Sequence, residues 1–217
     1  MPDAALTYPA LAVRLLALPP SCGPVRLVAV DGPSGAGKST FTDHLAAALP
    51  DAGGAPGGVG GRPPSEGRVG APVVRSDDFQ VPWDADPLTW WRPLRETVLT
   101  PFREGRPGVL RRYDWHRDRY GPSEQVPPAP VVIIEGVGAA WAESPAAYRI
   151  WIDAPHDLRR ARALDRDGPE YAGAWDAWST REKAHFTTDA TRDRSDLLVD
   201  GTALVQHRFK TCPREPE

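Results

Sequence analysis

The chain contains no asparagine and has only two cysteines among its 217 residues. A chain without asparagine cannot carry the N-K-x-D motif that reads guanine, which excludes a GTPase of that type. Cys22 and Cys212 lie near opposite ends, so no zinc-binding spacing is present. Two isolated cysteines are typical of a reduced protein, and we expect a cytoplasmic one.

Long apolar runs and an excess of positive charge are also missing. No apolar run approaches membrane-spanning length, so we expect no membrane partner. The formal net charge of −3 provides no broad basic surface for nucleic acid. Residues 6–18 are mildly apolar but contain Arg14 and follow no basic segment, so we expect a helical extension at 1–24 rather than a signal peptide. The oligomeric state stays open, and a homo-oligomer is compatible with the sequence.

The most informative segment present is a phosphate-binding loop with the pattern G-x-x-x-x-G-K-S. It consists of Gly32, Pro33, Ser34, Gly35, Ala36, Gly37, Lys38 and Ser39, followed by Thr40. The apolar, β-branched run at 25–31 predicts a buried parallel strand before it. The Ala- and Leu-rich stretch at 40–49 predicts a helix after it. This agreement argues against the alternative, a glycine-rich turn that merely contains a lysine.

Such a loop binds a nucleotide through its backbone. Its N–H groups and the helix N-terminus would bind the phosphate oxygens of ATP. Lys38 would reach the β- and γ-phosphates, and Ser39 would bind Mg²⁺. The sequence therefore predicts ATP and Mg²⁺ as cofactors.

Nearly apolar strands alternate with helical stretches along the rest of the chain. This order predicts an α/β protein with a three-layer P-loop NTPase fold, a mainly parallel five-stranded sheet and a helical lid. We expect one P-loop domain over 1–217, with its lid at 156–175. Residues 51–71 are rich in glycine and proline and predict a flexible surface insertion, because they cannot bury apolar area. Polar residues that follow the strands would meet at the carboxyl edge of the sheet.

Carboxylates follow two of the predicted strands. Glu135 ends the apolar strand at 131–134, where a Walker B carboxylate holds Mg²⁺; a capping or solvated acid is the alternative. Asp77 and Asp78 end the strand at 72–76, where a carboxylate can accept the proton of an acceptor hydroxyl. Adjacent side chains point in different directions, so we expect one to serve the site and the other to cap a turn. The alternative is that both aspartates are ordinary turn residues.

The predicted helix at 156–167 is rich in arginine. Arg159, Arg162 and Arg166 share a face, which would close over the phosphates as a lid. A solvated face that pairs with nearby aspartates is an equally good interpretation for any single arginine.

Aromatic and polar residues also gather at two other places. Tyr113, Asp114 and His116 would form an acceptor pocket, and aromatic packing at a loop is the alternative. We expect the tryptophans at 83, 90 and 91 to pack a subdomain rather than contact a ligand.

Taken in order, these motifs resemble the uridine kinase family of P-loop kinases, with phosphoribulokinase and bacterial pantothenate kinase as wider relatives. The matching segments, which span roughly residues 25 to 200, are the P-loop, Asp77-Asp78-Phe79, Tyr113-Asp114-Trp115, Ile133-Ile134-Glu135-Gly136 and the lid arginines. The resemblance implies a small-molecule kinase in which Asp77 is the base and Glu135 supports Mg²⁺. Lys38, Arg162 and Arg166 would stabilise the transferring phosphate. The acceptor would contact Asp77, Tyr113, Asp114, His116 and Arg159.

Departures from the family pattern lie on the acceptor side. Ala163 stands where the family's lid often has a further arginine, and Gly168-Pro169-Glu170-Tyr171 replaces an R-G-R that often follows. His116 follows Trp115 directly, whereas the family's sugar-contacting histidine lies further on. We expect a nucleoside-like acceptor, with the 5′-hydroxyl of uridine or cytidine first. The alternatives are another small metabolite (a pantothenate-like alcohol, a sugar or a natural product) and a regulatory nucleotide-binding NTPase.

Overall fold

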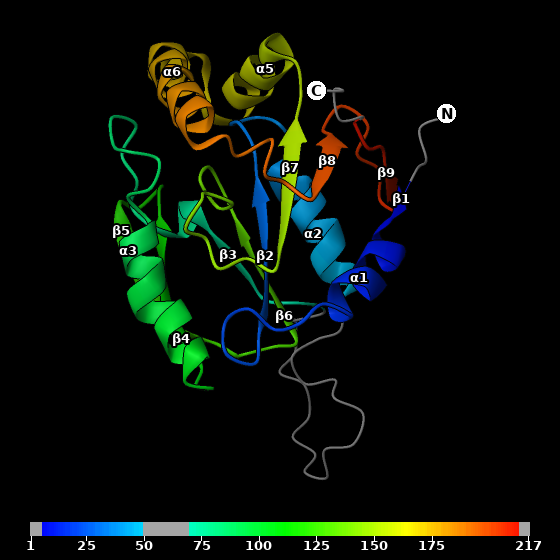
Figure 1. Ribbon diagram of the computed structural model, residues 1–217. Helices are drawn as coiled ribbons and strands as arrows, with labels where there is room; N and C mark the ends of the chain where they lie inside the picture. Colours follow the sequence, from blue (N-terminus) through cyan, green and yellow to red (C-terminus); the bar gives the residue numbers. More distant parts are fainter. Residues whose placement is uncertain (1–5, 50–69, 213–217) are drawn as a thin grey trace.

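The computed structural model describes residues 6–49 and 70–212 of the chain (Figure 1). Its centre is a sheet of five strands in the order β3-β6-β2-β7-β8, and every neighbouring pair is parallel. The strands are β2 (Arg26–Asp31), β3 (Val73–Arg75), β6 (Val131–Glu135), β7 (Tyr148–Asp153) and β8 (Leu197–Asp200). The α/β class and the parallel five-stranded sheet are therefore confirmed. The predicted insertion at 51–71 lies outside the described residues except for its last two.

The central strands are apolar along their length because helices cover both faces of the sheet. All five residues of β6 are buried, and so are the last five of the six in β2. On one face, α1 (Tyr8–Leu16) and α2 (Lys38–Ala48) pack against alternate strand residues such as Val28 and Ile133.

The opposite face is covered by a broken helical segment. It comprises α3 (Trp91–Leu94), the π-helical turn η2 (Arg95–Leu99) and α4 (Thr100–Arg103). Trp90, Leu94 and Phe102 are buried there against the other set of strand residues. The three layers that the sequence predicts are thus two helical layers and the sheet between them.

Two short pairings complete the frame. β1 (Leu6–Thr7) pairs antiparallel with β9 (Arg208–Phe209). β4 (Gly108–Asp114) and β5 (Arg119–Val126) form an antiparallel hairpin that the sequence pattern did not predict.

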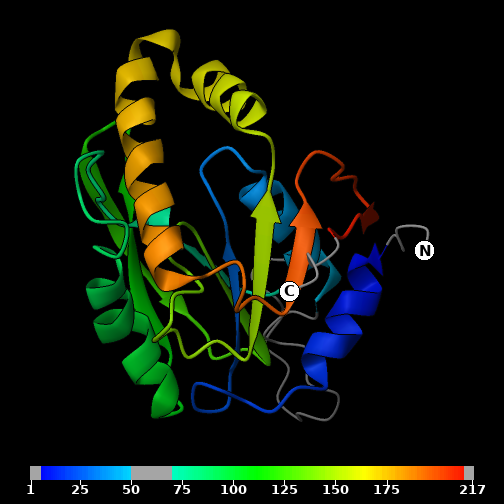
Figure 2. The same ribbon diagram turned by 45° about the horizontal axis from the view of Figure 1, so that its top comes forward.

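The segment predicted as a lid, 156–175, and the helix that continues it stand over the carboxyl edge of the sheet. They are α5 (His156–Asp167), the short turn η3 (Pro169–Tyr171) and α6 (Ala172–Asp189). Figures 1 and 2 both show α5 and α6 on the side toward which β7 and β8 point. Across residues 6–49 and 70–212, no helix combines the length and apolar character needed to cross a membrane.

Candidate active site

The P-loop joins β2 to α2 and depends on glycine for its shape. Gly32 has φ +137°, and a Cβ on it would lie 2.0 Å from the carbonyl oxygen of Ile152. Gly35 has φ +80°, and its Cβ would lie 2.3 Å from the carbonyl oxygen of Arg159. Only glycine tolerates both the left-handed backbone and the close approach. The loop is therefore wedged between β7 and α5.

Lys38 binds its own loop. Its Nζ donates hydrogen bonds to the carbonyl oxygens of Gly32, at 2.8 Å, and Pro33, at 3.1 Å. The Lys38 side chain is buried and its ammonium bonds to two loop carbonyls, which keeps a positive charge at the place where phosphate would bind.

Ser39 and Glu135 form the predicted magnesium pair. The Ser39 Oγ lies 3.5 and 3.4 Å from the two carboxylate oxygens of Glu135, and Arg75 Nε donates to Glu135 at 3.1 Å. Burial raises the pKa of Glu135 to about 7; the charges of Lys38 and Arg75 oppose that shift, and the charge of Asp77 adds to it. Hydroxyl and carboxylate oxygens are the ligand types that Mg²⁺ prefers. The donor set therefore fits a magnesium ion held jointly with nucleotide phosphates.

The structure separates the two adjacent aspartates. Asp78 is buried, accepts a hydrogen bond from the backbone N–H of Arg75 at 2.8 Å and pairs with Arg112 of β4. Asp77 is exposed and lines the central cavity. Trp115 Nε1 donates to the Asp77 carbonyl oxygen at 2.9 Å, which anchors the backbone without using the carboxylate. Asp78 is the capping residue, and Asp77 is the carboxylate available to a ligand.

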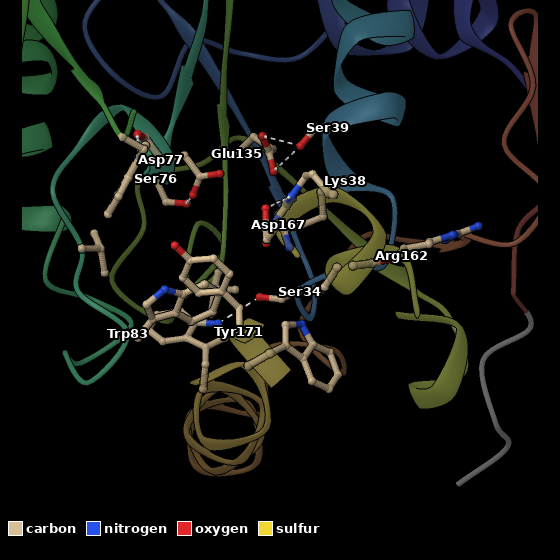
Figure 3. A pocket seen from close by; sticks show the side chains of 18 of the residues that line it. Ser34, Lys38, Ser39, Ser76, Asp77, Trp83, Glu135, Arg162, Asp167 and Tyr171 are labelled. Carbon is tan, nitrogen blue, oxygen red and sulfur yellow. Dashed lines mark hydrogen bonds and ion pairs between the residues drawn. The ribbon is translucent and has the colours of Figure 1, made fainter. Parts of the chain in front are cut away.

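A cavity of about 840 Å³ brings the predicted groups together (Figure 3). Its wall includes the predicted residues Ser34, Gly35, Gly37, Lys38, Ser39, Thr40, Asp77, His116, Glu135, Arg162 and Arg166. Figure 3 shows Lys38, Ser39 and Glu135 close together, with Asp77 to one side of them. The predicted phosphate-binding groups and the exposed carboxylate of Asp77 thus face one space.

Two lid arginines reach this cavity. Arg162 Nη1 donates to the carbonyl oxygens of Gly35, at 3.3 Å, and Gly201, at 3.1 Å. Arg166 forms a two-fold hydrogen-bonded pair with Asp167, both bonds at 2.7 Å. Its pKa is raised first by that pairing and then by the charges of Asp77 and Glu135. Arg166 therefore places a positive charge at the cavity wall that also includes Asp77 and Glu135.

Three residues predicted to contact the acceptor do not line the cavity. The Tyr113 hydroxyl accepts from Gln80 Nε2 at 3.0 Å and donates to Asp118, and this second bond is the main reason its pKa rises to about 12. Asp114 Oδ1 accepts from the backbone N–H groups of residues 116 and 117, which makes it a turn cap. Arg159 bonds to the carbonyl oxygen of Ser34 in the P-loop and to Glu182 of α6. Of the predicted acceptor residues, Asp77 and His116 line the cavity.

Aromatic rings occupy much of the wall instead. The aromatic lining residues are Trp83, Trp90, Trp115, Tyr171, Trp175 and Trp178. Trp90 and Trp91 pack a subdomain as expected, since their indole N–H groups bond to the carbonyl oxygens of Val137 and Gly138. Trp83 and Trp90 nevertheless both line the cavity, and the ring centroid of Trp83 lies 6.4 Å from that of Tyr171.

Two buried carboxylates that the sequence analysis overlooked support the loop. Asp31 accepts backbone N–H bonds from Gly32, Gly138 and Ala140 at 2.7 to 3.0 Å, which ties the P-loop to the segment after β6. Burial raises the pKa of Asp31 to about 7, against the effect of these bonds. Glu182 of α6 accepts from the backbone N–H of Ser34 at 2.9 Å. The apolar run before Asp31 hinted at its burial, but no local pattern marks Glu182.

Comparisons with known proteins bear on the fold. No protein-family model matches the chain, and no curated protein sequence matches it. A possible uridine kinase from Bacillus stearothermophilus superposes with a TM-score of 0.59 at 18% identity, over 87% of this chain and 95% of that chain. A candidate fructose transport system kinase from Silicibacter sp. TM1040 superposes with a TM-score of 0.55 at 23% identity, over 82% of this chain and 95% of that one. The fold is that of the P-loop kinases, as the motif order predicted.

Proposed function

We propose that the chain is a Mg-ATP-dependent phosphotransferase that moves the γ-phosphate of ATP to an alcohol. The kinase-like fold supports the general class. The observation that carries the proposal is the cavity wall, where Lys38, Ser39 and Glu135 face the same space as the exposed carboxylate of Asp77. Within the described residues that carboxylate accepts one hydrogen bond, from Ser76 Oγ at 3.3 Å. A carboxylate in this position can accept the proton of an acceptor hydroxyl, which phosphotransfer to an alcohol requires.

Each residue would have a distinct role in the transfer. Asp77 would accept the proton of the acceptor hydroxyl while the hydroxyl oxygen of the acceptor bonds to the γ-phosphorus. The bond between the γ-phosphorus and the β-phosphate oxygen would break, which releases ADP. Lys38 would leave the loop carbonyls for the β- and γ-phosphates, and Arg162 and Arg166 would balance negative charge on the transferring group. Ser39 and Glu135 would hold Mg²⁺, which supplies charge neutralisation when bound.

The acceptor has two candidates. The motif order supports a pyrimidine nucleoside, with the 5′-hydroxyl of uridine or cytidine as the reacting group. A second candidate, another small metabolite, is favoured by the acceptor side of the cavity. The polar side-chain atoms of Tyr113 and Asp114 form hydrogen bonds within the protein, and the cavity wall contains aromatic rings instead of these two residues. Such a wall suits a flat body with few hydroxyl groups better than a polyhydroxylated sugar.

The deciding experiment is ADP release from Mg-ATP across uridine, cytidine, pantothenate, sugars and aromatic primary alcohols, with Lys38→Ala as the control. Strong stimulation by uridine or cytidine, lost in the control, would establish the nucleoside. Stimulation by another alcohol alone would select the second candidate. ADP release that no acceptor stimulates would reject phosphotransfer to these alcohols and favour a regulatory NTPase.

A further inference from the structure

Ser34, the third residue of the P-loop, is bound at every polar atom by side chains of α5 and α6. Its backbone N–H donates to Glu182 Oε2 at 2.9 Å, and its carbonyl oxygen accepts from Arg159 Nη1 at 3.2 Å. Its Oγ accepts from Trp178 Nε1 at 2.9 Å. The helices α5 and α6 therefore hold the phosphate loop directly.

Glu182 is the buried centre of this arrangement. Its side chain is 1% exposed and that of Arg159 is 12% exposed, and Arg159 Nη1 lies 3.1 Å from Glu182 Oε1. Arg159 also donates through Nε to the carbonyl oxygen of Ala154 at 3.1 Å and stacks over the Trp175 ring. A buried carboxylate is stable only when its oxygens are paired, and here both oxygens accept from donors.

This pairing sets the direction of a peptide group. In the peptide group between Pro33 and Ser34, the carbonyl oxygen accepts a hydrogen bond from Lys38 Nζ. The N–H of the same peptide group donates to Glu182. The next carbonyl oxygen is turned toward Arg159, so the N–H of Gly35 in the same plane points the opposite way. A run of loop N–H groups aimed at one point is what binds a phosphate.

We propose that Glu182 is a positioning residue for the P-loop, which fixes the peptide groups around Ser34 and so prepares the loop N–H groups for the nucleotide phosphates. The inference rests on the proposed function in that it takes a nucleotide as the ligand of the loop. Glu182 touches the loop rather than the reacting atoms, so its effect belongs in nucleotide affinity and not in the chemical step.

The test is Glu182→Gln. Both partners of the carboxylate are donors, so the variant turns its NH2 group toward one of them, the Ser34 N–H or Arg159 Nη1, and loses the hydrogen bond from that donor. We expect the Kd for Mg-ADP, measured by calorimetry on folded protein, to rise about 5- to 20-fold. The KM for ATP should rise in parallel while kcat changes less than about threefold.

The matched control is Asp176→Asn. Asp176 of α6 accepts two hydrogen bonds from Arg160 of α5, at 2.8 and 3.1 Å, and its side chain is 51% exposed. The same chemical change is thus made between the same two helices, but away from the loop. The Kd for Mg-ADP should stay within about twofold of wild type.

A second variant keeps the test decisive if Glu182→Gln does not fold. Trp178→Phe removes the bond to the Ser34 Oγ and also shortens a ring that lines the cavity and packs against Trp83. We expect a rise of about two- to fivefold in the Kd for Mg-ADP. Wild-type affinity in folded Glu182→Gln, or in Trp178→Phe if the first variant cannot be made, would overturn the proposal. A collapse of kcat at unchanged KM would also overturn it. If wild-type protein fails to bind Mg-ADP, both this inference and the proposed function fail. If Lys38→Ala loses Mg-ADP binding while Glu182→Gln keeps wild-type affinity, only this inference fails.

Discussion

Lys38 and Glu182 hold opposite edges of one peptide group. Lys38 Nζ binds the carbonyl oxygen of Pro33 at 3.1 Å, and Glu182 Oε2 binds the N–H of Ser34 at 2.9 Å. A cation and an anion thus orient the same plane from opposite sides, and both side chains are buried. The conformation of the phosphate loop comes from distant side chains as well as from its glycines.

Removing one partner of the Arg159–Glu182 pair should lower the free energy of unfolding far more than replacing both partners by apolar residues. Arg159→Met leaves Glu182 as a buried charge without its cationic partner, and the free energy of unfolding should fall by about 3–5 kcal/mol. The double variant Arg159→Met with Glu182→Leu should recover much of this loss, because no charge then stays buried. Urea denaturation of wild type, Arg159→Met, Glu182→Leu and the double variant measures the coupling free energy between the two side chains. Additive effects would mean that the two side chains do not stabilise each other.

Asp77 should act in the chemical step alone. Asp77→Ala removes the proposed proton acceptor, and phosphotransfer should fall by about 100-fold or more. The carboxylate contacts no P-loop group among the hydrogen bonds of the described residues, so the affinity for ATP should be nearly unchanged. Steady-state kinetics and calorimetry separate the two effects. A loss of ATP binding equal to the loss of rate would contradict the assignment of Asp77 as the base.

The neighbouring Asp78 should behave as a structural residue. Asp78→Ala removes the acceptor of the Arg75 N–H and the partner of Arg112, and we expect about 1–3 kcal/mol less stability. In the folded protein kcat should stay within about threefold of wild type. Thermal melting and initial rates provide both numbers. A stable but inactive variant would exchange the roles of the two aspartates.

Gly35 and Gly105 offer a matched pair of substitutions. Both have positive φ, +80° and +70°, but a Cβ on Gly35 would lie 2.3 Å from a backbone oxygen, whereas one on Gly105 would meet nothing within 4 Å. Gly105→Ala should cost about 1–2 kcal/mol for the left-handed backbone alone. Gly35→Ala should cost distinctly more and weaken Mg-ADP binding, because α5 or the loop must move. Similar losses of stability in the two variants would show that the loop yields easily.

His185 should reduce stability in mild acid. Burial lowers its pKa below 6.5, although Asp189 and Asp86 nearby favour the charged ring and Arg194 disfavours it. Below pH 6.5 the unfolded chain therefore takes up a proton that the folded chain resists, and the free energy of unfolding falls as pH falls.

The slope from this one group is at most about 1.4 kcal/mol per pH unit. Within the part of the chain that the structure describes, His185 Nε2 has no hydrogen-bond partner, so His185→Phe should fold and show a flatter loss of stability between about pH 6.5 and pH 5. Urea denaturation at several pH values makes the comparison. Parallel pH profiles for the two proteins would exclude His185 as the source.

Sequence patterns predicted the parts of the fold that are apolar and local. The strands β2 and β6 are nearly continuous apolar runs, and the P-loop between β2 and α2 has a fixed spacing. The hairpin β4–β5 escaped prediction because exposed and half-buried residues dominate β5, which leaves no apolar alternation to detect. Its folding decides that Tyr113 and Asp114 face internal partners.

The candidate site was predictable where a residue follows a strand. Asp77 and Glu135 reach the cavity because parallel strands place their carboxyl ends along one edge. Arg159 and Glu182 could not be assigned from the sequence, because they lie on helices whose neighbours are also charged. Only the packing of α5 and α6 on the loop decides which charges are buried.

The bond between Ser34 and Glu182 joins residues 148 positions apart. A chain made from its N-terminus produces the phosphate-binding motif early, while the side chains that hold Ser34 come much later. A nascent chain that ends before Glu182 carries the full motif without the groups that shape it. The nucleotide site is therefore completed late in synthesis, when most of the sheet that carries it has already been made.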